Sequence, residues 1–298
     1  EQSQFVVPEK RLNEIVAFVE RGLQDFSISR LVSKMPWGIP VPDDEEHVMY
    51  VWFDALVNYI STIGWNVDQE QFEKFWPGVQ IAGKDNLRQQ TAMWQAMLLS
   101  AGLAPSKQIL IHGHITCNGQ KMSKSLGNVV SPEEMIGKFG KDGARYLLLS
   151  AAVFGEDIDL SWERMTEKYN ADLANGLGNL VSRVLKLADR ITNQEVRITE
   201  KCVEHMPQEF LRLLENYRLN DGLEYIWDIV RKSNKYIEDE KPWELAKTDT
   251  EKFETVMKKL LNDLSIIAHL LAPFLPETSE NIRTMLAERR GGILFQRI

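Results

Sequence analysis

The sequence has few cysteines, no long apolar run and no excess of positive charge. Its two cysteines, Cys117 and Cys202, are isolated, without a Cys-x-x-Cys pair or a histidine at ligand spacing, so neither a disulfide scaffold nor a zinc site is supported. No apolar stretch approaches the roughly 18 residues of a membrane span, and the start Glu1-Gln2-Ser3-Gln4-Phe5 does not resemble a secretory leader. We expect a protein of a reducing compartment, the cytoplasm, without a membrane segment.

The composition is that of a globular chain whose surface is not basic overall. With 298 residues, 44% of them hydrophobic, the chain has the length of about two domains and enough apolar residues for sizeable cores. The formal net charge of -8 argues against nucleic-acid binding by bulk attraction. Any RNA contact must therefore rely on local basic clusters and stacking surfaces.

The first half of the sequence alternates between predicted strands and helices. Short apolar runs predict buried strands over Val48–Phe53, Val79–Gly83 and Ile109–Gly113. The spacing of apolar residues predicts helices over 8–26, 55–63 and 85–101. This order implies a parallel sheet, in which ligands bind beyond the carboxyl ends of the strands. Several residues at those ends are site candidates: Asp54, Gly83, Lys84, Asp85, His112 and His114.

A basic loop follows the last of these strands. Asn118-Gly119 lies between two short runs and is the strongest short hairpin signal. The string Lys121-Met122-Ser123-Lys124-Ser125 comes next, with two lysines three positions apart. Lysine is a point charge on a flexible stem, and serine hydroxyls and loop N–H groups can donate to phosphate oxygens. The string suits a mobile loop that closes on phosphates, although an arbitrary basic loop is more often simply solvated.

The second half is predicted to be helical. Ser131-Pro132-Glu133-Glu134 marks a helix start, and a further helix is expected over 142–152, after Gly140. Ser161 caps the next helix. Amphipathic patterns then predict helices over 175–191, 208–217, 222–238, 250–271 and 279–288, broken at Lys241-Pro242-Trp243 and at 273–276. The expected fold is α/β over 1–157 followed by an all-α bundle over 158–298.

The lysine string is the signature of class I aminoacyl-tRNA synthetases, and the resemblance extends beyond it. The segments that resemble methionyl-tRNA synthetase in order and spacing are Trp37 to Pro42, Tyr50 to Ala55, Gly83-Lys84-Asp85, Lys121 to Asn128 and Asn175 to Arg183. The resemblance implies the second half of a Rossmann-like sheet, a stem-contact region with the lysine loop, and an anticodon-binding bundle. It also implies the activity, which joins methionine to ATP as an adenylate, with Mg²⁺ accompanying the ATP, and then esterifies tRNA(Met).

The resemblance implies roles for individual residues on the nucleotide side. Lys121 and Lys124 match the loop lysines that stabilise the triphosphate during attack on its α-phosphorus, a role that is electrostatic. Arg30 matches an arginine near the pyrophosphate, and Asp85 matches the acidic residue on the ribose side, although a helix N-cap would also explain Asp85. The remaining expected ATP contacts are Gly83, His112 and Ser123.

The resemblance also implies a methionine pocket and an RNA face. Trp52, Ala55, Tyr59 and Trp94 match pocket residues, since a thioether packs well against ring edges, although aromatic residues at this spacing are often core. Asn86 and Gln90 stand where the family usually has isoleucine and histidine, which makes the pocket edge more polar. Four residues match those that read the CAU anticodon by stacking and hydrogen bonds: Asn175, Asn179, Arg183 and Trp243.

One family element is missing from the sequence. No His-x-Gly-His signature precedes the predicted strands, and His112-Gly113-His114 lies too close to the lysine loop to be that signature. We therefore expect this chain to correspond to the C-terminal portion of the enzyme, with the other half of the adenylate site on a missing N-terminal half. Two alternatives stay open: a tRNA-binding fragment without chemistry, and a class I synthetase for leucine, isoleucine, valine or cysteine.

Overall fold

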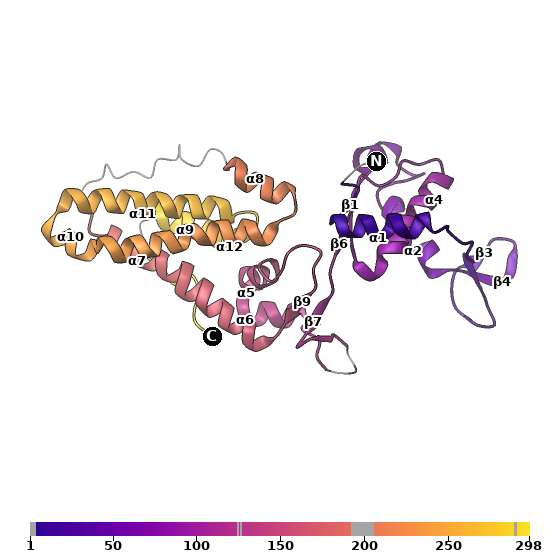
Figure 1. Cartoon of the computed structure of the whole chain (residues 1–298), viewed down its shortest axis with the longest axis horizontal. Helices are drawn as coiled ribbons and strands as arrows, with labels where there is room; N and C mark the ends of the chain where they lie inside the picture. The colour runs from indigo at the N-terminus through magenta and orange to yellow at the C-terminus, as the bar shows by residue number, and fades with distance from the viewer. Residues whose placement is uncertain (1–3, 124, 126, 192–205, 289–290) are drawn as a thin grey trace. The chain divides into compact units, whose positions relative to one another are not determined.

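The computed structural model describes residues 4–123, 125, 127–191, 206–288 and 291–298. The chain divides into two compact units, Glu1–His114 and Ile115–Ile298, which we call the amino-terminal and the carboxy-terminal unit (Figure 1). Lys124 and Cys202 lie outside the described residues.

A parallel sheet of three strands forms the centre of the amino-terminal unit. Strand β6 (Gln108–His112) lies between β1 (Val6–Val7) and β5 (Val79–Gly83), and both neighbours run parallel to it. The sequence predicts β5 and β6 correctly, as well as their parallel pairing, but not the short β1. Ile109 and Ile111 of β6 are fully buried, and α1 (Glu9–Glu20) covers this core through Ile15.

The strand expected over Val48–Phe53 is wrong in two respects. Strand β4 (Asp44–Met49) ends before Tyr50, and it pairs antiparallel with β2 (Ser29–Leu31) and β3 (Pro40–Val41) in a separate sheet. Helix α2 (Val51–Ser61) begins directly afterwards, so Asp54 lies in the first turn of a helix and not at a strand end. A short apolar run has no periodicity that separates a buried strand from the start of a buried helix.

The connection between β5 and β6 is helical as expected, but it is not one regular helix. It begins with the 3-10 turn η1 (Lys84–Asn86), continues through the π-helical turn η2 (Gln89–Met93), and ends with α4 (Trp94–Ser100). A second core lies between this segment, α2 and α3 (Gln69–Phe75), with Trp94, Leu56 and Phe72 buried in it. Widened π turns are rare, and they occur frequently at functional sites.

A small sheet opens the carboxy-terminal unit. Strands β7 (Ile115–Cys117) and β8 (Gln120–Lys121) form the predicted hairpin, with φ of 52° at Asn118 and 72° at Gly119. Strand β9 (Ile158–Leu160) returns to pair parallel with β7. This pairing ties the lysine-loop region to the helical part of the chain, so the compact units meet at 114/115, earlier than the boundary expected near Asp157.

Helix α5 (Pro132–Leu149) begins at the predicted capping box. The Ser131 side chain accepts from the Glu134 N–H, and the Glu134 side chain accepts from the Ser131 N–H. The helix is kinked at Gly140, whose φ of 71° and ψ of 168° are not helical. Ser161 caps α6 (Trp162–Lys168) by accepting from the Arg164 N–H, also as predicted.

The rest of the unit is the expected helical bundle (Figure 1). Its elements are η4 (Tyr169–Gly178, a π helix), α7 (Asn179–Ala188), α8 (Gln208–Glu215), α9 (Leu219–Glu240), α10 (Pro242–Thr248), α11 (Thr250–Leu271) and α12 (Pro276–Glu288). Their shared core is made of fully buried side chains such as Leu180, Phe210 and Leu264. Lys241 adopts a left-handed conformation at the expected break, but Pro242 then starts a new helix, which the sequence analysis does not predict.

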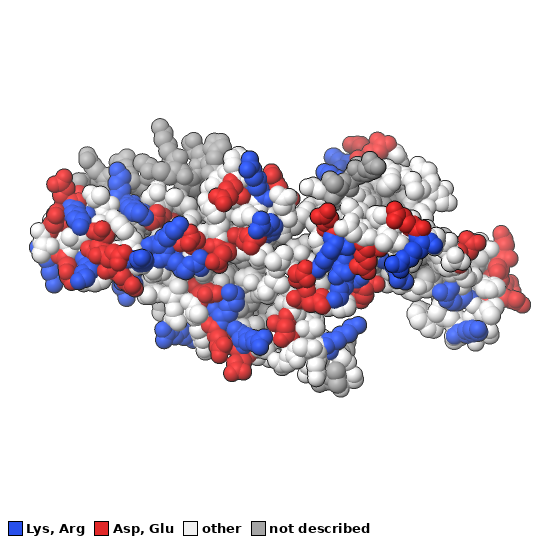
Figure 2. All heavy atoms as spheres, in the orientation of Figure 1, with Lys and Arg blue, Asp and Glu red and all other residues white. Residues whose placement is uncertain are grey.

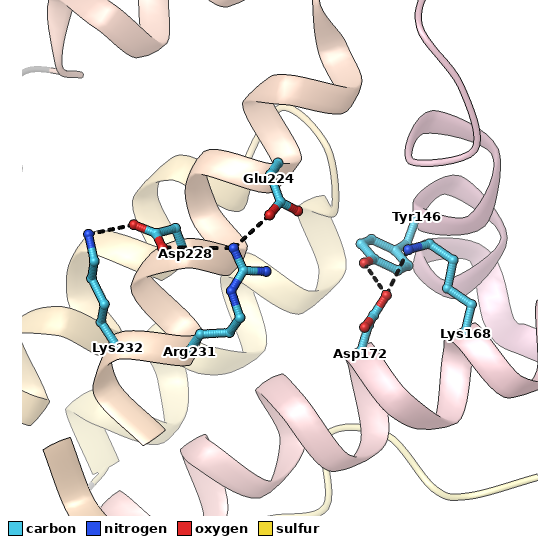
Figure 3. Close-up of polar contacts among 7 residues, drawn as sticks. All are labelled: Tyr146, Lys168, Asp172, Glu224, Asp228, Arg231 and Lys232. Atoms are coloured by element: carbon cyan, nitrogen blue, oxygen red, sulfur yellow. Dashed lines mark hydrogen bonds and ion pairs between the residues drawn. The ribbon is translucent and has the colours of Figure 1, made fainter. Parts of the chain in front are cut away.

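Polar contacts join α5 and α6 to η4 (Figure 3), and ring stacking joins α5 to α9. The Tyr146 hydroxyl and the Lys168 ammonium both donate to Oδ2 of Asp172, and the Tyr146 ring stacks on Trp227 of α9 at a centroid distance of 4.4 Å. These contacts fix η4, and η4 leads directly into α7.

None of the helices among the described residues has the length and apolar character needed to span a bilayer.

Candidate functional site

The carboxyl ends of β5 and β6 bring three of the predicted nucleotide residues together. Gly83 and His112 are register partners in the sheet. A Cβ atom on Gly83 would lie 2.7 Å from Oδ1 of Asp85 and 3.6 Å from Cε1 of His112, so this position admits only glycine without a shift. Asp85 lies inside η1, after its N-cap Gly83, and its side chain is 59% exposed. Its carboxylate is therefore available to a ligand rather than used as the cap of that turn.

Two histidines, His112 and His114, lie at this edge of the sheet. Together with Gly83 and Asp85 they form what we call the sheet-end cluster. Nδ1 of His112 lies 2.7 Å from the Gly113 carbonyl oxygen, which fixes the ring beside Gly83 and makes Nδ1 the protonated nitrogen of the neutral form. Nε2 of His114 lies 3.9 Å from Oδ1 of Asp85. The cluster combines one carboxylate with two imidazole rings at a strand end, an arrangement suited to hydroxyl and phosphate groups.

Four of the predicted methionine residues form a second cluster, which we call the aromatic cluster. Trp52 and Tyr59 come from α2, Gln90 from η2, and Trp94 from the start of α4. Nε2 of Gln90 donates to the Tyr59 hydroxyl at 2.9 Å, and the Tyr59 and Trp94 ring centroids are 6.1 Å apart. Gln90, which stands where the resembled family usually has histidine, is only 2% exposed and is thus buried within the aromatic cluster.

The aromatic cluster is also part of the hydrophobic core, as the plainer interpretation of the sequence holds. Trp94 packs edge-on against Trp76 at 6.2 Å and is 1% exposed. Two polar atoms of the cluster, Nε1 of Trp94 and Oε1 of Gln90, are nevertheless buried without a hydrogen-bond partner among the described residues. Of the other two candidates, Ala55 is exposed on α2 and Asn86 is partly buried in η1.

Arg30 makes local contacts on β2. Its Nη1 donates to the carbonyl oxygens of Ser27 and Ser29 at 2.9 and 2.7 Å, and its guanidinium lies 4.1 Å from the Tyr50 ring centroid. Within the described residues, these contacts join Arg30 to β2 and to the start of α2, and not to the sheet-end cluster.

The side chains of Asn128 and Asp159, outside the lysine string, hold the backbone at the two ends of its loop. Oδ1 of Asn128 accepts from the Ser123 N–H at 2.8 Å, and Nδ2 of Asn128 donates to the Lys121 carbonyl at 3.2 Å. Asp159 accepts from the Gly119 N–H at 2.6 Å and from the Thr116 hydroxyl, and these hydrogen bonds hold the pKa of Asp159 below its ordinary value. Both ends of the loop are therefore fixed.

Of the two loop lysines, Lys121 is among the described residues, and its ammonium group is not paired there. Lys121 is exposed. The Ser123 hydroxyl lies 2.7 Å from that of Ser125. Lys124, the other catalytic candidate, is outside the described residues. An exposed ammonium without an ion pair keeps its charge available for an anion.

The predicted RNA residues gather on η4, α7 and α10 of the carboxy-terminal unit. Asn179 is exposed one turn before Arg183, whose Nη1 lies 4.0 Å from Oε1 of Glu238 near the end of α9. Trp243 is the second residue of α10, just beyond that end, and is 37% exposed. Arg183 and Trp243 therefore both lie near the carboxyl end of α9.

Asn175 has a partner that the sequence analysis does not find. Its Oδ1 accepts from Nε of Arg297 at 2.7 Å, a residue 122 positions away. A single arginine after an apolar stretch carries no signal of such a contact.

Over the face of the molecule in view, basic and acidic side chains are interspersed (Figure 2), and the net charge of the chain is -8. RNA binding here would depend on individual side chains rather than on a single-sign field.

Among the described residues, no group of three or more His, Cys, Asp or Glu side chains is close enough to hold a metal ion. Cys117 is buried as a free thiol. The clusters described above consist of carboxylate, imidazole, amide and aromatic groups.

Two family models match the chain. The model described as tRNA synthetases class I (M) matches residues 1–185, and the anticodon binding domain of methionyl tRNA ligase matches residues 178–292. Curated relatives include the methionine–tRNA ligases of Thermotoga maritima, 39% identical over 95% of this chain, and of Clostridium acetobutylicum, 40% identical over 95%. The chain spans 46% of the length of each, about half.

Solved structures give the same result. A Mycobacterium tuberculosis methionyl-tRNA synthetase in complex with methionyl-adenylate matches with a TM-score of 0.81 and 35% identity, over 95% of this chain and 58% of that one. The apo form of the same enzyme matches with a TM-score of 0.80 and 30% identity, over 99% of this chain and 64% of that one. The matches in sequence and structure run through both compact units, and this chain therefore belongs to the methionyl-tRNA synthetase family.

Proposed function

We propose that this chain carries the amino-acid, triphosphate and anticodon subsites of a methionine–tRNA ligase. The observation that carries the proposal is the aromatic cluster with Gln90 and Trp94 on the same helical segment as Asp85 of the sheet-end cluster. An apolar, aromatic wall suits a thioether side chain, and the neighbouring carboxylate and imidazoles suit a nucleotide. Within one unit, the chain thus has groups for both substrates of amino-acid activation.

In the first step, a carboxylate oxygen of methionine attacks the α-phosphorus of ATP, and pyrophosphate leaves with the electrons of the broken P–O bond. Asp85 accepts hydrogen bonds from the ribose hydroxyls, while Gly83 lets the nucleotide approach the sheet end beside His112. Lys121 and Lys124, with Ser123, neutralise the charge that moves onto pyrophosphate. Mg²⁺ accompanying the ATP would add positive charge beside the phosphate groups.

In the second step, a hydroxyl of the terminal adenosine of tRNA(Met) attacks the methionyl carbonyl carbon, and AMP leaves. The tRNA is held at its anticodon by Trp243, which stacks on a base, and by Asn179 and Arg183, which donate to base edges and phosphates. Asn175 supports this face. We assign 1–157 to catalysis and stem contact and 158–298 to anticodon recognition, in the cytoplasm.

We infer that an N-terminal half, on the same or a separate chain, completes the adenylate site. Strand β5 is an edge strand, and its alternate side chains Val79 and Ile81 are 47% and 62% exposed. An unpaired edge with exposed apolar side chains favours pairing with a further strand. This edge is the surface on which we expect the completing half to dock.

The test is amino-acid-dependent ATP–pyrophosphate exchange, measured for this chain alone and together with the N-terminal half of a relative. We expect no exchange from the chain alone and methionine-dependent exchange from the pair. Leucine, isoleucine, valine and cysteine serve as competitors, because Gln90 and Asn86 make the pocket edge polar. Exchange driven by one of these would reassign the substrate. Anticodon stem-loop binding without exchange, in a pair that forms a stable complex, would favour the tRNA-binding module instead.

A further inference from the structure

A buried amide outside the aromatic cluster holds the segment that carries two of its members. Gln95 lies in the first turn of α4, directly after Trp94, and is 7% exposed. Its Nε2 donates to the Gln90 carbonyl oxygen at 2.9 Å. That carbonyl belongs to the π-helical turn η2, in which N–H groups bond carbonyls five residues back, as the Trp94 N–H does to Gln89. The Gln95 side chain therefore reinforces the widened turn from within.

The other end of the Gln95 side chain is anchored beside the parallel sheet. The Ser106 N–H donates to Oε1 of Gln95 at 3.0 Å, and Nε2 of Gln95 also donates to the Ser106 hydroxyl at 3.0 Å. The Ser106 hydroxyl in turn donates to Oε1 of Gln80 on β5 at 2.6 Å. Ser106 and Gln80 are each 4% exposed. Because one backbone donor and one backbone acceptor are satisfied by the two ends of the same amide, the orientation of Gln95 is unambiguous.

The π turn η2 affects the direction in which the side chains after it point. A π turn inserts one residue into a helix and shifts the direction of every side chain beyond it by about 100° relative to a regular α-helix. In this chain the shift leaves Gln90 beside the Tyr59 hydroxyl and the Trp94 ring beside the Tyr59 ring. Gln90 and Trp94 are four residues apart and therefore share one face of the segment, and the direction of that face depends on how the turn is held.

We propose that Gln95 is a positioning residue of the amino-acid pocket: by linking the Gln90 carbonyl to Ser106, it holds the π turn and thereby sets Gln90 and Trp94 against Tyr59. The proposal rests on the proposed function of the aromatic cluster. Gln95 makes no contact with the substrate in this role. Its effect is on the amino acid and not on ATP, since Gly83 and Asp85 precede the turn and His112 lies on the separate strand β6.

The test compares Gln95→Leu, which keeps the volume but loses both hydrogen-bonding ends, with a variant that loses a different buried hydrogen bond nearby. Thr91→Val removes a hydroxyl that donates to the Leu87 carbonyl at 2.6 Å in the same turn. In ATP–pyrophosphate exchange assays on the completed enzyme, we expect Gln95→Leu to raise the KM for the amino acid about tenfold, with kcat and the KM for ATP within about twofold. Thr91→Val should keep the wild-type KM.

Hydrogen–deuterium exchange of this chain by itself provides a readout independent of catalysis. Amides of residues 89–95 should exchange at least about tenfold faster in Gln95→Leu than in Thr91→Val. If Gln95→Leu does not fold, Gln95→Met replaces it, because an unbranched chain fills the same space without a donor. An unchanged amino-acid KM in a folded variant would overturn the inference while the proposed function stands. If the wild-type enzyme shows no ATP–pyrophosphate exchange with any amino acid, the proposed function is overturned. The deuterium-exchange result would then test only whether Gln95 holds the π turn.

Discussion

The Tyr146 hydroxyl donates a hydrogen bond of 2.7 Å to Oδ2 of Asp172, and Lys168 donates to the same oxygen at 2.8 Å (Figure 3). Tyr146 is 3% exposed and stacks on Trp227, so the hydrogen bond forms in a site that water does not reach freely. The contact joins α5 to η4, the helix that leads into the proposed RNA face. Removing the hydroxyl should therefore destabilise the carboxy-terminal unit.

The Tyr146→Phe variant should lower the free energy of unfolding of the carboxy-terminal unit by about 1.5 to 3 kcal/mol, the usual contribution of a hydrogen bond to a charged group. Urea unfolding followed by far-UV circular dichroism measures it. Tyr225→Phe is the matched control, because its hydroxyl has no hydrogen bond within the described residues and its ring packs on Phe210. Equal losses in both variants would mean that the Asp172 contact contributes nothing.

The ionisation of Tyr146 should lower the free energy of unfolding at alkaline pH. Burial, and next the nearby charge of Asp172, raise the pKa of Tyr146 above its ordinary value of 10.0. The folded state thus favours the neutral hydroxyl, whose contribution is complete below pH 10 and falls as the pH rises above it. Between pH 9 and 11, wild-type stability should fall more steeply than that of Tyr146→Phe. Tyr169, whose pKa burial also raises, is present in both proteins and cancels. Parallel curves would contradict the assignment.

Gly83→Ala should weaken ATP use in the completed enzyme. The added methyl group would lie 2.7 Å from Oδ1 of Asp85 and displace the carboxylate proposed to hold the ribose. We expect the KM for ATP to rise about tenfold, or about 1.4 kcal/mol, with the KM for methionine nearly unchanged. Gly78→Ala is the control just before the same strand, where the nearest atom, the Phe75 carbonyl oxygen, is at an ordinary 3.4 Å. A normal KM for ATP would remove Asp85 from the nucleotide site.

Trp243→Ala should weaken binding of an anticodon stem-loop by about 1 to 3 kcal/mol, the range for loss of one stacked base. Fluorescence anisotropy with a labelled stem-loop measures the change. Val153→Ala, also an exposed apolar residue of the same unit at 52% exposure, should leave the affinity as it is. Unchanged affinity in Trp243→Ala would count against the RNA face in both the enzyme and the binding-module interpretation.

Lys124→Ala should slow pyrophosphate exchange by the completed enzyme about 100-fold, or about 2.7 kcal/mol in the barrier. The reason is the loss of a positive charge where negative charge moves onto the leaving group. Lys74→Ala removes an exposed lysine of α3 and should have no effect on the exchange rate. A Lys124→Ala enzyme with the wild-type rate would exclude this lysine from the reaction.

Local signals in the sequence predict the parts of the fold that depend on local physics. The Asn118-Gly119 turn, the capping box at Ser131 and the bounds of α11 are each visible in a few neighbouring residues, and all three are confirmed. The strand expected over Val48–Phe53 fails because an apolar run without a period fits either a strand or a helix, and only the pairing of β4 with β2 decides where the strand ends.

Features that depend on distant partners were beyond sequence reasoning. The π turn is held by the contact between Gln95 and Ser106, which lie 11 residues apart, and the Asn175–Arg297 contact spans most of the carboxy-terminal unit. Likewise, nothing near Asp157 indicates that β9 returns to β7. Candidate site residues were found through family resemblance, whereas the residues that orient them were not, because their spacing follows no local pattern.

The β7–β9 pairing has a mechanical consequence. It joins the Lys121 end of the hairpin to the helical bundle, and Trp243 of α10 belongs to the same compact unit. A rotation about the 114/115 junction would therefore move the hairpin and Trp243 together.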